Sequence, residues 1–211
     1  MIAPADIAGR VKVCGLRSAE EARACIEAGV DLVGLVFAPG SRRRLDIAQA
    51  RAVREAIGGR AEVVGVFMDQ TRHEVEQYAS ALRLDRLQLH GGEDCHAFLD
   101  IGLPLIKRLP PRVARPQSWP PRVWLLLDPG AGSGAAFDWE ADGGVDARGA
   151  MVAGGLSPDN VEHVIRATGA AAVDVSSGVE AVAGHKDPSR IASFCARARA
   201  ALAPALTEVG A

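Results

Sequence analysis

The chain has 211 residues, 48% of them hydrophobic, with a formal net charge of −2 and a sequence pI of about 6.2. A chain of this length can bury the core of one domain, which we expect to span residues 1–211. The charge balance argues against a nucleic-acid partner and no stretch approaches the ~20 apolar residues that cross a bilayer, so we expect a small-molecule partner.

Short apolar segments alternate with helical patterns along the chain, which is typical of a parallel sheet built from βα units. The predicted strands lie at residues 10–14, 31–37, 62–67, 85–90, 104–108, 123–128, 150–153 and 172–176. Helix starts are predicted where a capping residue precedes a glutamate or a proline, at Ser18, Thr71, Ser157 and Asp187. The exception is residues 109–122, where five prolines leave little room for a helix.

Eight βα units in about this length predict an α/β fold, a single-domain (β/α)8 TIM barrel with a Pro-rich, degraded fifth crossover. In such barrels the carboxyl ends of the strands and the loops after them carry the active site. Polar residues at the ends of the predicted strands are therefore the candidates for function.

Cys14 ends the first predicted strand and is followed by Gly15. A free cysteine is usually a small buried hydrophobe, and Cys25, Cys95 and Cys195 on predicted helices fit that interpretation. Cys14 differs because its thiol should face the mouth of the barrel, where a thiolate can act as a base. Because a thiol ordinarily has a pKa of about 8.5, this role requires nearby positive charge or a helix N-terminus. The separated cysteines predict no zinc site and a reducing cytoplasm.

Asp128 ends the sixth predicted strand and is a candidate general acid. That role requires a pKa raised by burial or by a like charge. The glycines at 130, 132 and 134 superficially match a dinucleotide-binding turn. They follow the sixth strand instead of opening a βαβ unit, and residues 135–139 do not begin a long amphipathic helix, so we favour a loop beside a catalytic carboxylate.

Two loops rich in glycine and serine follow the seventh and eighth predicted strands. Their candidate binding residues are Gly154, Gly155, Asp174, Ser176, Ser177 and Gly178. Glycines allow close backbone approach, serines donate hydrogen bonds, and a helix N-terminus offers free N–H groups to an anion. The alternative is that Ser177 and Glu180 form only a capping box, and the glycine pair only a turn. Because barrels commonly bind phosphate at these two loops, we predict a phosphorylated substrate.

Arg42, Arg43 and Arg44 follow the second predicted strand, either as a solvated loop or as the source of a clamp for a carboxylate. His90 ends the fourth strand and either lines the mouth of the barrel or packs as a hydrogen-bonded histidine. The remaining histidines have no metal-ligand spacing and are given no role: His73, His96, His163 and His185.

Taken together, these motifs resemble those of the phosphoribosylanthranilate isomerase family, a barrel of tryptophan biosynthesis. The resemblance covers residues 10–202 and rests on Lys12-Val13-Cys14-Gly15, residues 34–37 with Ser41-Arg42-Arg43, residues 64–67, Gln88-Leu89-His90-Gly91, Leu127-Asp128 with 132–134 and 137–139, Gly154-Gly155-Leu156 with Asn160-Val161, and residues 174–180 with Lys186-Asp187. Arg44 departs from the family, which often has an aromatic residue at that position.

The resemblance implies an isomerase that catalyses the Amadori rearrangement of N-(5′-phosphoribosyl)anthranilate to 1-(2-carboxyphenylamino)-1-deoxyribulose 5-phosphate, without a metal or other cofactor. It implies that Asp128 protonates the furanose ring oxygen and that Cys14 removes the proton from the second sugar carbon. It places Arg43 on the anthranilate side, with His90 and the glycine and serine loops as the other substrate contacts. We expect a monomer or a homodimer in the cytoplasm.

Two other functions stay open on the sequence. One is a histidine-pathway or dual-substrate sugar-phosphate isomerase. A resemblance to such barrels would imply a pair of aspartates at these strand ends, where this chain has Cys14. The other is a non-catalytic, phosphate-binding regulatory barrel, which the presence of both Cys14 and Asp128 argues against. Turnover of the candidate substrate distinguishes the three.

Overall fold

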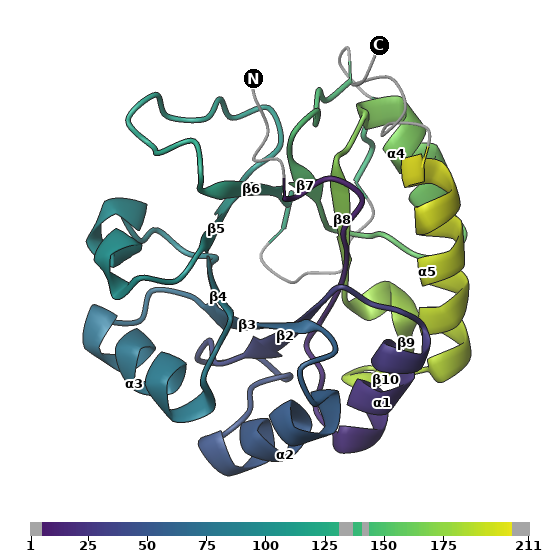
Figure 1. Cartoon of the computed structure of the whole chain (residues 1–211). Helices are drawn as coiled ribbons and strands as arrows, with labels where there is room; N and C mark the ends of the chain where they lie inside the picture. The colour runs from purple at the N-terminus through teal and green to yellow at the C-terminus, as the bar shows by residue number, and fades with distance from the viewer. Residues whose placement is uncertain (1–5, 131–136, 141–143, 204–211) are drawn as a thin grey trace.

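The computed structural model describes residues 6–130, 137–140 and 144–203. Within them, eight parallel strands form a closed barrel in the order of the sequence (Figure 1). The strands are β1 (Val11–Cys14), β2 (Leu32–Val36), β3 (Glu62–Phe67), β4 (Arg86–Leu89), β5 (Leu105–Leu109), β6 (Trp124–Leu127), β7 (Met151–Val152) and β8 (Ala172–Val175). All eight predicted strands are confirmed, because short apolar runs suit strands that are buried on both faces.

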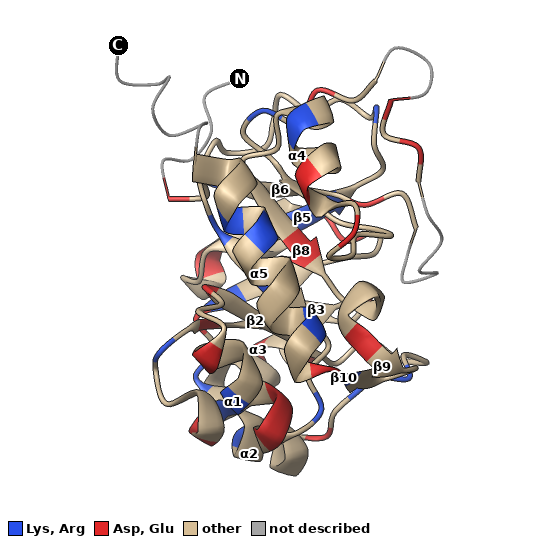
Figure 2. Ribbon diagram, turned by 90° about the vertical axis from the view of Figure 1, so that its right-hand side faces the viewer, with Lys and Arg blue, Asp and Glu red and all other residues tan. Residues whose placement is uncertain are grey.

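Five α-helices cover the outside of the barrel: α1 (Ala19–Glu27), α2 (Ile47–Ile57), α3 (Arg72–Leu82), α4 (Val161–Thr168) and α5 (Pro188–Leu202). The long helix α5 packs against both α1 and α4, on the side of the molecule that Figure 2 presents. Across the described ranges, no helix is long and apolar enough to cross a membrane.

The predicted caps begin helices for the reasons expected, with two exceptions. Thr71 and Glu74 form a complete capping box, and Asp187 accepts hydrogen bonds from the first turn of α5. Ser18 caps α1, but the carboxylate of Glu21 accepts the backbone N–H of Lys186 instead of closing the box. Ser157 is not the N-cap of α4, which is Asn160: the Ser157 hydroxyl accepts the backbone N–H of Asp159, in a turn that precedes the first helical residue, Val161.

Several crossovers depart from regular βα units. The predicted fourth helix is the 3₁₀ helix η1 (Cys95–Ile101). Residues 110–122 contain no helix, as their prolines predicted, and neither do residues 137–140 and 144–150 after β6. The eighth strand leads into the three-residue 3₁₀ helix η3 (Ser177–Val179) and a hairpin, β9 (Glu180–Val182) and β10 (His185–Lys186), which the sequence analysis did not predict.

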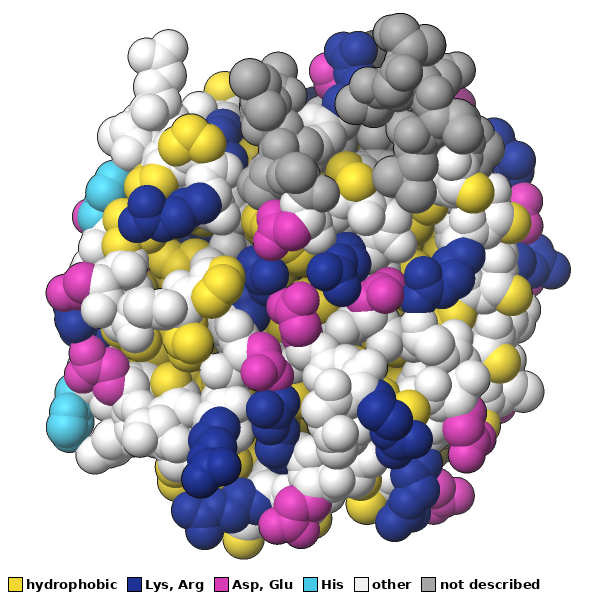
Figure 3. Space-filling model, in the orientation of Figure 1, with side chains coloured by type: hydrophobic (Ala, Val, Ile, Leu, Met, Phe, Trp, Pro, Cys, Tyr) yellow, Lys and Arg dark blue, Asp and Glu magenta, His cyan; other side chains and the backbone are white. Residues whose placement is uncertain are grey.

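Two layers of buried side chains hold the barrel. One lies between the strands and the helices, and the other fills the barrel interior with Ile7, Leu32, Val64, Ile106, Trp124, Leu126, Met151, Ala153 and Ala172. In the same interior, the guanidinium of Arg86 stacks 3.7 Å from the ring centroid of Trp124. On the face shown in Figure 3, acidic and basic side chains are interleaved, with no single basic region.

Candidate active site

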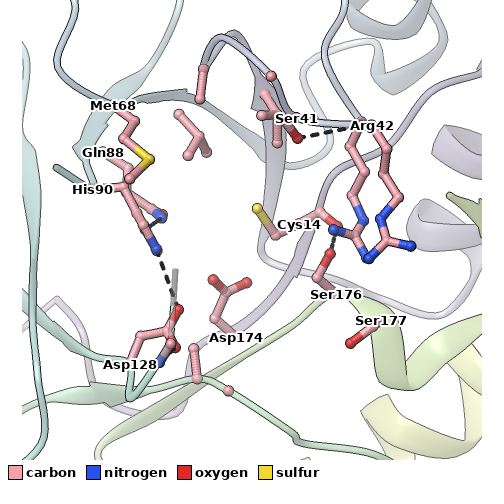
Figure 4. A pocket seen from close by; sticks show the side chains of 18 of the residues that line it. Cys14, Ser41, Arg42, Met68, Gln88, His90, Asp128, Asp174, Ser176 and Ser177 are labelled. Atoms are coloured by element: carbon pink, nitrogen blue, oxygen red, sulfur yellow. Dashed lines mark hydrogen bonds and ion pairs between the residues drawn. The ribbon is translucent and has the colours of Figure 1, made fainter. Parts of the chain in front are cut away.

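A cavity of about 410 Å³ opens at the carboxyl ends of the barrel strands (Figure 4). Nine of the predicted site residues line it: Cys14, Arg43, His90, Asp128, Gly154, Gly155, Asp174, Ser176 and Ser177. Gly178 is not among its lining residues. The fold therefore brings together groups from β1, β4, β6, β7 and β8 and from the loop after β2.

Cys14 lies at the end of β1, and its side chain points into the cavity (Figure 4). The residue is only 8% exposed. Its neighbour on β2 is Gly34, where a Cβ atom would lie 2.7 Å from the Cys14 sulfur. A glycine is thus required at that position, because any side chain would displace the thiol.

The charges around Cys14 oppose one another. Burial raises the pKa of the thiol, the cations of Lys12 and Lys186 lower it, and the carboxylate of Asp174 raises it. The net pKa lies above the ordinary value, so the resting group is a thiol at neutral pH. The sequence analysis required positive charge near this sulfur, and the two buried lysines provide it.

Lys12 lies two residues before Cys14 on β1, on the same side of the strand. Its side chain is fully buried, and its ammonium donates a hydrogen bond of 2.9 Å to Asp174 Oδ2 on the neighbouring strand β8. The other oxygen, Asp174 Oδ1, is buried without a hydrogen-bond partner among the described residues. Figure 4 shows the carboxylate of Asp174 pointing into the cavity, so a ligand hydroxyl is a suitable partner for it.

Asp128 lies at the end of β6, across the cavity from Cys14 (Figure 4). Burial raises the pKa of its carboxyl to about 6, although the backbone N–H of Gly130 donates to Oδ1 and opposes that shift. The guanidinium of Arg108 donates to the Asp128 carbonyl oxygen at 2.8 and 3.0 Å, which fixes the end of the strand. A pKa of about 6 leaves the carboxylate as the main form at pH 7 but makes the protonated form, which a general acid needs, readily accessible.

His90 lies beside Asp128, with its Nε2 3.4 Å from Asp128 Oδ2. Its other ring nitrogen lies 3.3 Å from the side-chain nitrogen of Gln88. Burial and the nearby cations, Arg108 first, lower the pKa of His90 to about 4, so the ring is neutral at physiological pH. Both interpretations of His90 hold, because the ring lines the cavity and is also packed and hydrogen-bonded.

The loops after β7 and β8 meet at the end of the cavity predicted to hold phosphate. Gly154 and Gly155 have φ values of +92° and +68°, in the region that favours glycine. A Cβ atom on Gly178 would lie 1.8 Å from the carbonyl oxygen of Leu156, so this glycine lets the two loops pack together. The predicted helix N-terminus is wrong, because η3 spans only three residues and cannot supply a macrodipole.

Arg43 contacts the cavity from the loop after β2, but its guanidinium is already engaged. Its Nε and Nη2 donate to the carboxylate of Glu180 at 2.7 and 3.2 Å. Glu180 is thus not the capping residue of the alternative interpretation. Arg42 also lines the cavity and is more exposed than Arg43.

Several residues near the site were not predicted as site residues. Gln88 and Met68 line the cavity. Three further residues, Lys12, Glu180 and Lys186, do not line it but form buried hydrogen bonds next to it. A lysine or glutamine inside an otherwise apolar barrel strand is a signal that could have identified Lys12 and Gln88. The predicted loop at 132–134 lies outside the described residues.

The three remaining cysteines, Cys25, Cys95 and Cys195, are buried, as predicted for small hydrophobic residues. Burial raises the pKa of Cys25 to about 12 and that of Cys195 to about 11. Among the described residues, one group has the proximity a metal ion needs, Asp94 with Cys95 and His96. None of the three lines the cavity, and both ring nitrogens of His96 already have partners at 2.9 Å.

Comparisons with known proteins agree on one family. A family model described as N-(5'phosphoribosyl)anthranilate (PRA) isomerase matches residues 11–197. An isomerase of that name from Neisseria meningitidis serogroup C is 37% identical, covering 90% of this chain and 96% of its own. One from Zygosaccharomyces bailii is 41% identical, covering 87% of this chain and 94% of its own.

Solved structures give the same result. The phosphoribosyl anthranilate isomerase of Thermus thermophilus superposes with a TM-score of 0.77 at 36% identity, covering 89% of this chain and 97% of its own. A second such isomerase, solved in complex with reduced 1-(o-carboxyphenylamino)-1-deoxyribulose 5-phosphate, gives a TM-score of 0.74 at 32% identity, covering 90% of this chain and 98% of its own.

Proposed function

The chain belongs to the N-(5'-phosphoribosyl)anthranilate isomerase family, and we propose that it catalyses this step of tryptophan biosynthesis with Cys14 as base and Asp128 as acid. The observation that carries the proposal is the placement of these two groups. A buried thiol and a buried carboxyl face one cavity from opposite strands, and the loops after β7 and β8 complete its wall. An aldose-to-ketose rearrangement needs one group to deliver a proton and another to remove one.

In the first step, Asp128 donates its proton to the furanose ring oxygen. The bond between that oxygen and the first sugar carbon breaks, and the nitrogen lone pair forms a protonated Schiff base. The raised pKa of Asp128, about 6, suits this role because the acid form remains accessible near neutral pH. His90 is neutral beside it, with Nε2 3.4 Å from Asp128 Oδ2, and does not compete for the proton.

In the second step, the thiolate of Cys14 removes the proton from the second sugar carbon. The electrons of the broken C–H bond neutralise the Schiff base and give an enolamine, which tautomerises to the ketose. Lys12 and Lys186 supply the positive charge that favours the thiolate. Asp174 Oδ1, which has no partner among the described residues, is proposed to accept a hydrogen bond from a sugar hydroxyl.

Binding at the two ends of the substrate orients these steps. The phosphate is proposed to bind the backbone N–H groups and hydroxyls of the Gly154–Gly155 and Ser176–Ser177 loops. Arg43, which lines the cavity after β2, is proposed for the anthranilate carboxylate. Holding both ends fixes the reacting carbons between Cys14 and Asp128, and such positioning contributes several kcal/mol, roughly 7–11 at most.

The direct test is a fluorescence assay that follows the loss of phosphoribosylanthranilate, with the histidine-pathway aminoaldose as a competing substrate. The wild-type enzyme is expected to convert the first and not the second. Turnover of the second alone would favour the histidine-pathway function. Binding of either substrate without turnover would favour a regulatory barrel.

The cytoplasm and a monomeric or homodimeric state are further parts of the proposal. The four cysteines of the chain are free, as a reducing compartment would keep them. A Thermotoga maritima relative, 31% identical, is described as a dimeric enzyme from which monomers were generated. Sedimentation equilibrium of the purified chain distinguishes the two states.

A further inference from the structure

Glu180 is the centre of a buried group of hydrogen bonds beside the cavity. Its carboxylate accepts four: 2.7 and 3.2 Å from Arg43, 2.9 Å from the N–H of Gly184, and 3.0 Å from Lys186 Nζ. The side chain of Glu180 is 5% exposed and that of Lys186 is fully buried. Neither residue lines the cavity. A carboxylate with this many fixed donors has one orientation.

The same group reaches the loop after β8 and the end of β1. Lys186 Nζ also donates to the carbonyl oxygen of Ser176 at 3.0 Å and to its hydroxyl at 3.3 Å. The hydroxyl of Ser176 in turn donates 3.0 Å to the carbonyl oxygen of Cys14. Glu180 is therefore connected on one side to Arg43 and on the other to the proposed phosphate loop and to the backbone of the proposed base.

Arg43 is held from a second direction as well. A Cβ atom on Gly15, where φ is +79°, would lie 2.4 Å from Cδ of Arg43, so the arginine stem lies directly over the glycine backbone. The Glu180 carboxylate occupies Nε and Nη2, one edge of the planar guanidinium. With the stem and that edge both fixed, the N–H groups of Nη1 and the second N–H of Nη2 have no hydrogen-bond partner among the described residues and remain for a ligand.

We propose that Glu180 is a positioning residue that sets the orientation of Arg43 toward the substrate carboxylate. Through Lys186, it fixes this clamp relative to the loop that binds phosphate. The hairpin β9–β10 serves to place Glu180 and Lys186 side by side, since these residues pair across its two strands. This inference rests on the proposed function, because it assumes that Arg43 contacts the anthranilate carboxylate.

The test compares Glu180→Gln with wild type on two substrates, phosphoribosylanthranilate and its counterpart without the carboxylate, N-(5′-phosphoribosyl)aniline. With the first substrate, KM should rise about 10- to 100-fold, as for one hydrogen bond to a charged group, while kcat stays near the wild-type value. With the aniline substrate, KM should rise several-fold less, because only the link through Lys186 to the phosphate loop is then affected. Arg43→Met should abolish the preference of the wild-type enzyme for the carboxylated substrate.

Glu93→Gln is the matched control. Glu93 is also a 5% exposed carboxylate that accepts from a buried lysine, Lys107, at 2.8 Å and from a backbone N–H, that of Asp69, at 2.7 Å. It does not line the cavity. The two variants should lower the melting temperature similarly, but only Glu180→Gln should change KM.

Three outcomes would overturn the inference. Equal increases in KM for both substrates would mean that Glu180 supports the site only as a structural residue. An unchanged KM with a lowered melting temperature would mean the same. If instead Arg43→Met kept the wild-type preference for the carboxylated substrate, Arg43 would not be the clamp, and that part of the proposed function would fail together with the inference.

Discussion

The two sides of the cavity differ in what surrounds the titratable group. On the Cys14 side, two lysine ammonium groups, Lys12 and Lys186, lower the thiol pKa against the effect of burial. On the Asp128 side, the nearest titratable ring is His90, which burial keeps neutral, and the Arg108 guanidinium is bonded to the Asp128 backbone carbonyl. The lysines therefore assist a thiolate on the first side, whereas burial favours the neutral carboxyl on the second.

This difference shows how a Cys14 thiolate and a protonated Asp128 carboxyl, an uncommon pair of protonation states, become accessible together. At rest, the raised pKa of Cys14 and the pKa of about 6 for Asp128 make a thiol and a carboxylate the main forms at pH 7. The reactive forms, a thiolate and a carboxyl, contain the same number of protons. They differ from the resting forms by the position of one proton, so the lysines assist without any change in net charge.

Replacing the base should have the largest effect. Cys14→Ser preserves size but loses an accessible anion, because a serine hydroxyl does not ionise near neutral pH. We expect kcat to fall about 10⁴-fold, the upper end of what a positioned base contributes. The affinity for the reduced product analogue, measured by calorimetry, should stay unchanged. Near-normal turnover would show that another group removes the proton.

Replacing the acid should cost somewhat less. Asp128→Asn keeps the shape of the side chain and its contact with the Gly130 N–H, but it cannot deliver a proton. We expect kcat to fall about 10³-fold, since water can partly substitute as the proton donor. Steady-state fluorescence kinetics measure this loss. A fully active Asn variant would remove Asp128 from the mechanism.

Variants of Lys12 and Asp174 can change the charge beside Cys14 so that the pKa of its thiol falls or rises. Asp174→Asn removes the anion and leaves the Lys12 cation, so the pKa of Cys14 should fall. The double variant Lys12→Met/Asp174→Asn removes both charges without leaving either unpaired, so the pKa of Cys14 should lie above its value in Asp174→Asn.

The measurement is the pH dependence of the rate at which iodoacetamide alkylates Cys14, located by mass spectrometry. The other cysteines are buried and serve as internal controls. If Asp174→Asn and the double variant gave the same pKa, Lys12 would have no influence on the thiol. Each unit corresponds to about a tenfold change in the thiolate fraction at a fixed pH.

The barrel and the positions of Cys14 and Asp128 at its mouth could be predicted from the sequence because their signals are local. Short, largely apolar runs mark the strands, and Cys14 and Asp128 are polar residues at the ends of two of them. The crossovers were harder to predict. Cys95–Ile101 has the composition of a helix, and its tightening to 3₁₀ geometry depends on tertiary packing.

The charged residues behind the cavity could not be predicted because their partners are distant in sequence. Arg43 and Glu180 are 137 positions apart, and Lys12 and Asp174 are 162 apart. In its local context, Glu180 three residues after Ser177 fits a capping box, and only the closed barrel brings it to Arg43. The electrostatics of the site are therefore a property of the fold, whereas the placement of Cys14 and Asp128 at strand ends is already visible in the sequence.

The smallest expected effect concerns the identity of the group that controls activity at low pH. We expect kcat/KM to decrease as pH falls below about 6, where Asp128 becomes protonated. With both Asp128 and Cys14 protonated, moving a proton between them can no longer produce the thiolate and the carboxyl that react.

A decrease in activity at this pH, the acid limb of the pH profile, would ordinarily be assigned to a histidine. His90, with a pKa of about 4, is neutral throughout that range and cannot cause it. His90→Asn should therefore lower kcat/KM only a few-fold, by about the value of one neutral hydrogen bond, and leave the limb near pH 6. Disappearance of the limb in His90→Asn, measured from pH 5 to 9, would assign it to the imidazole and show that the acid side of the cavity is charged.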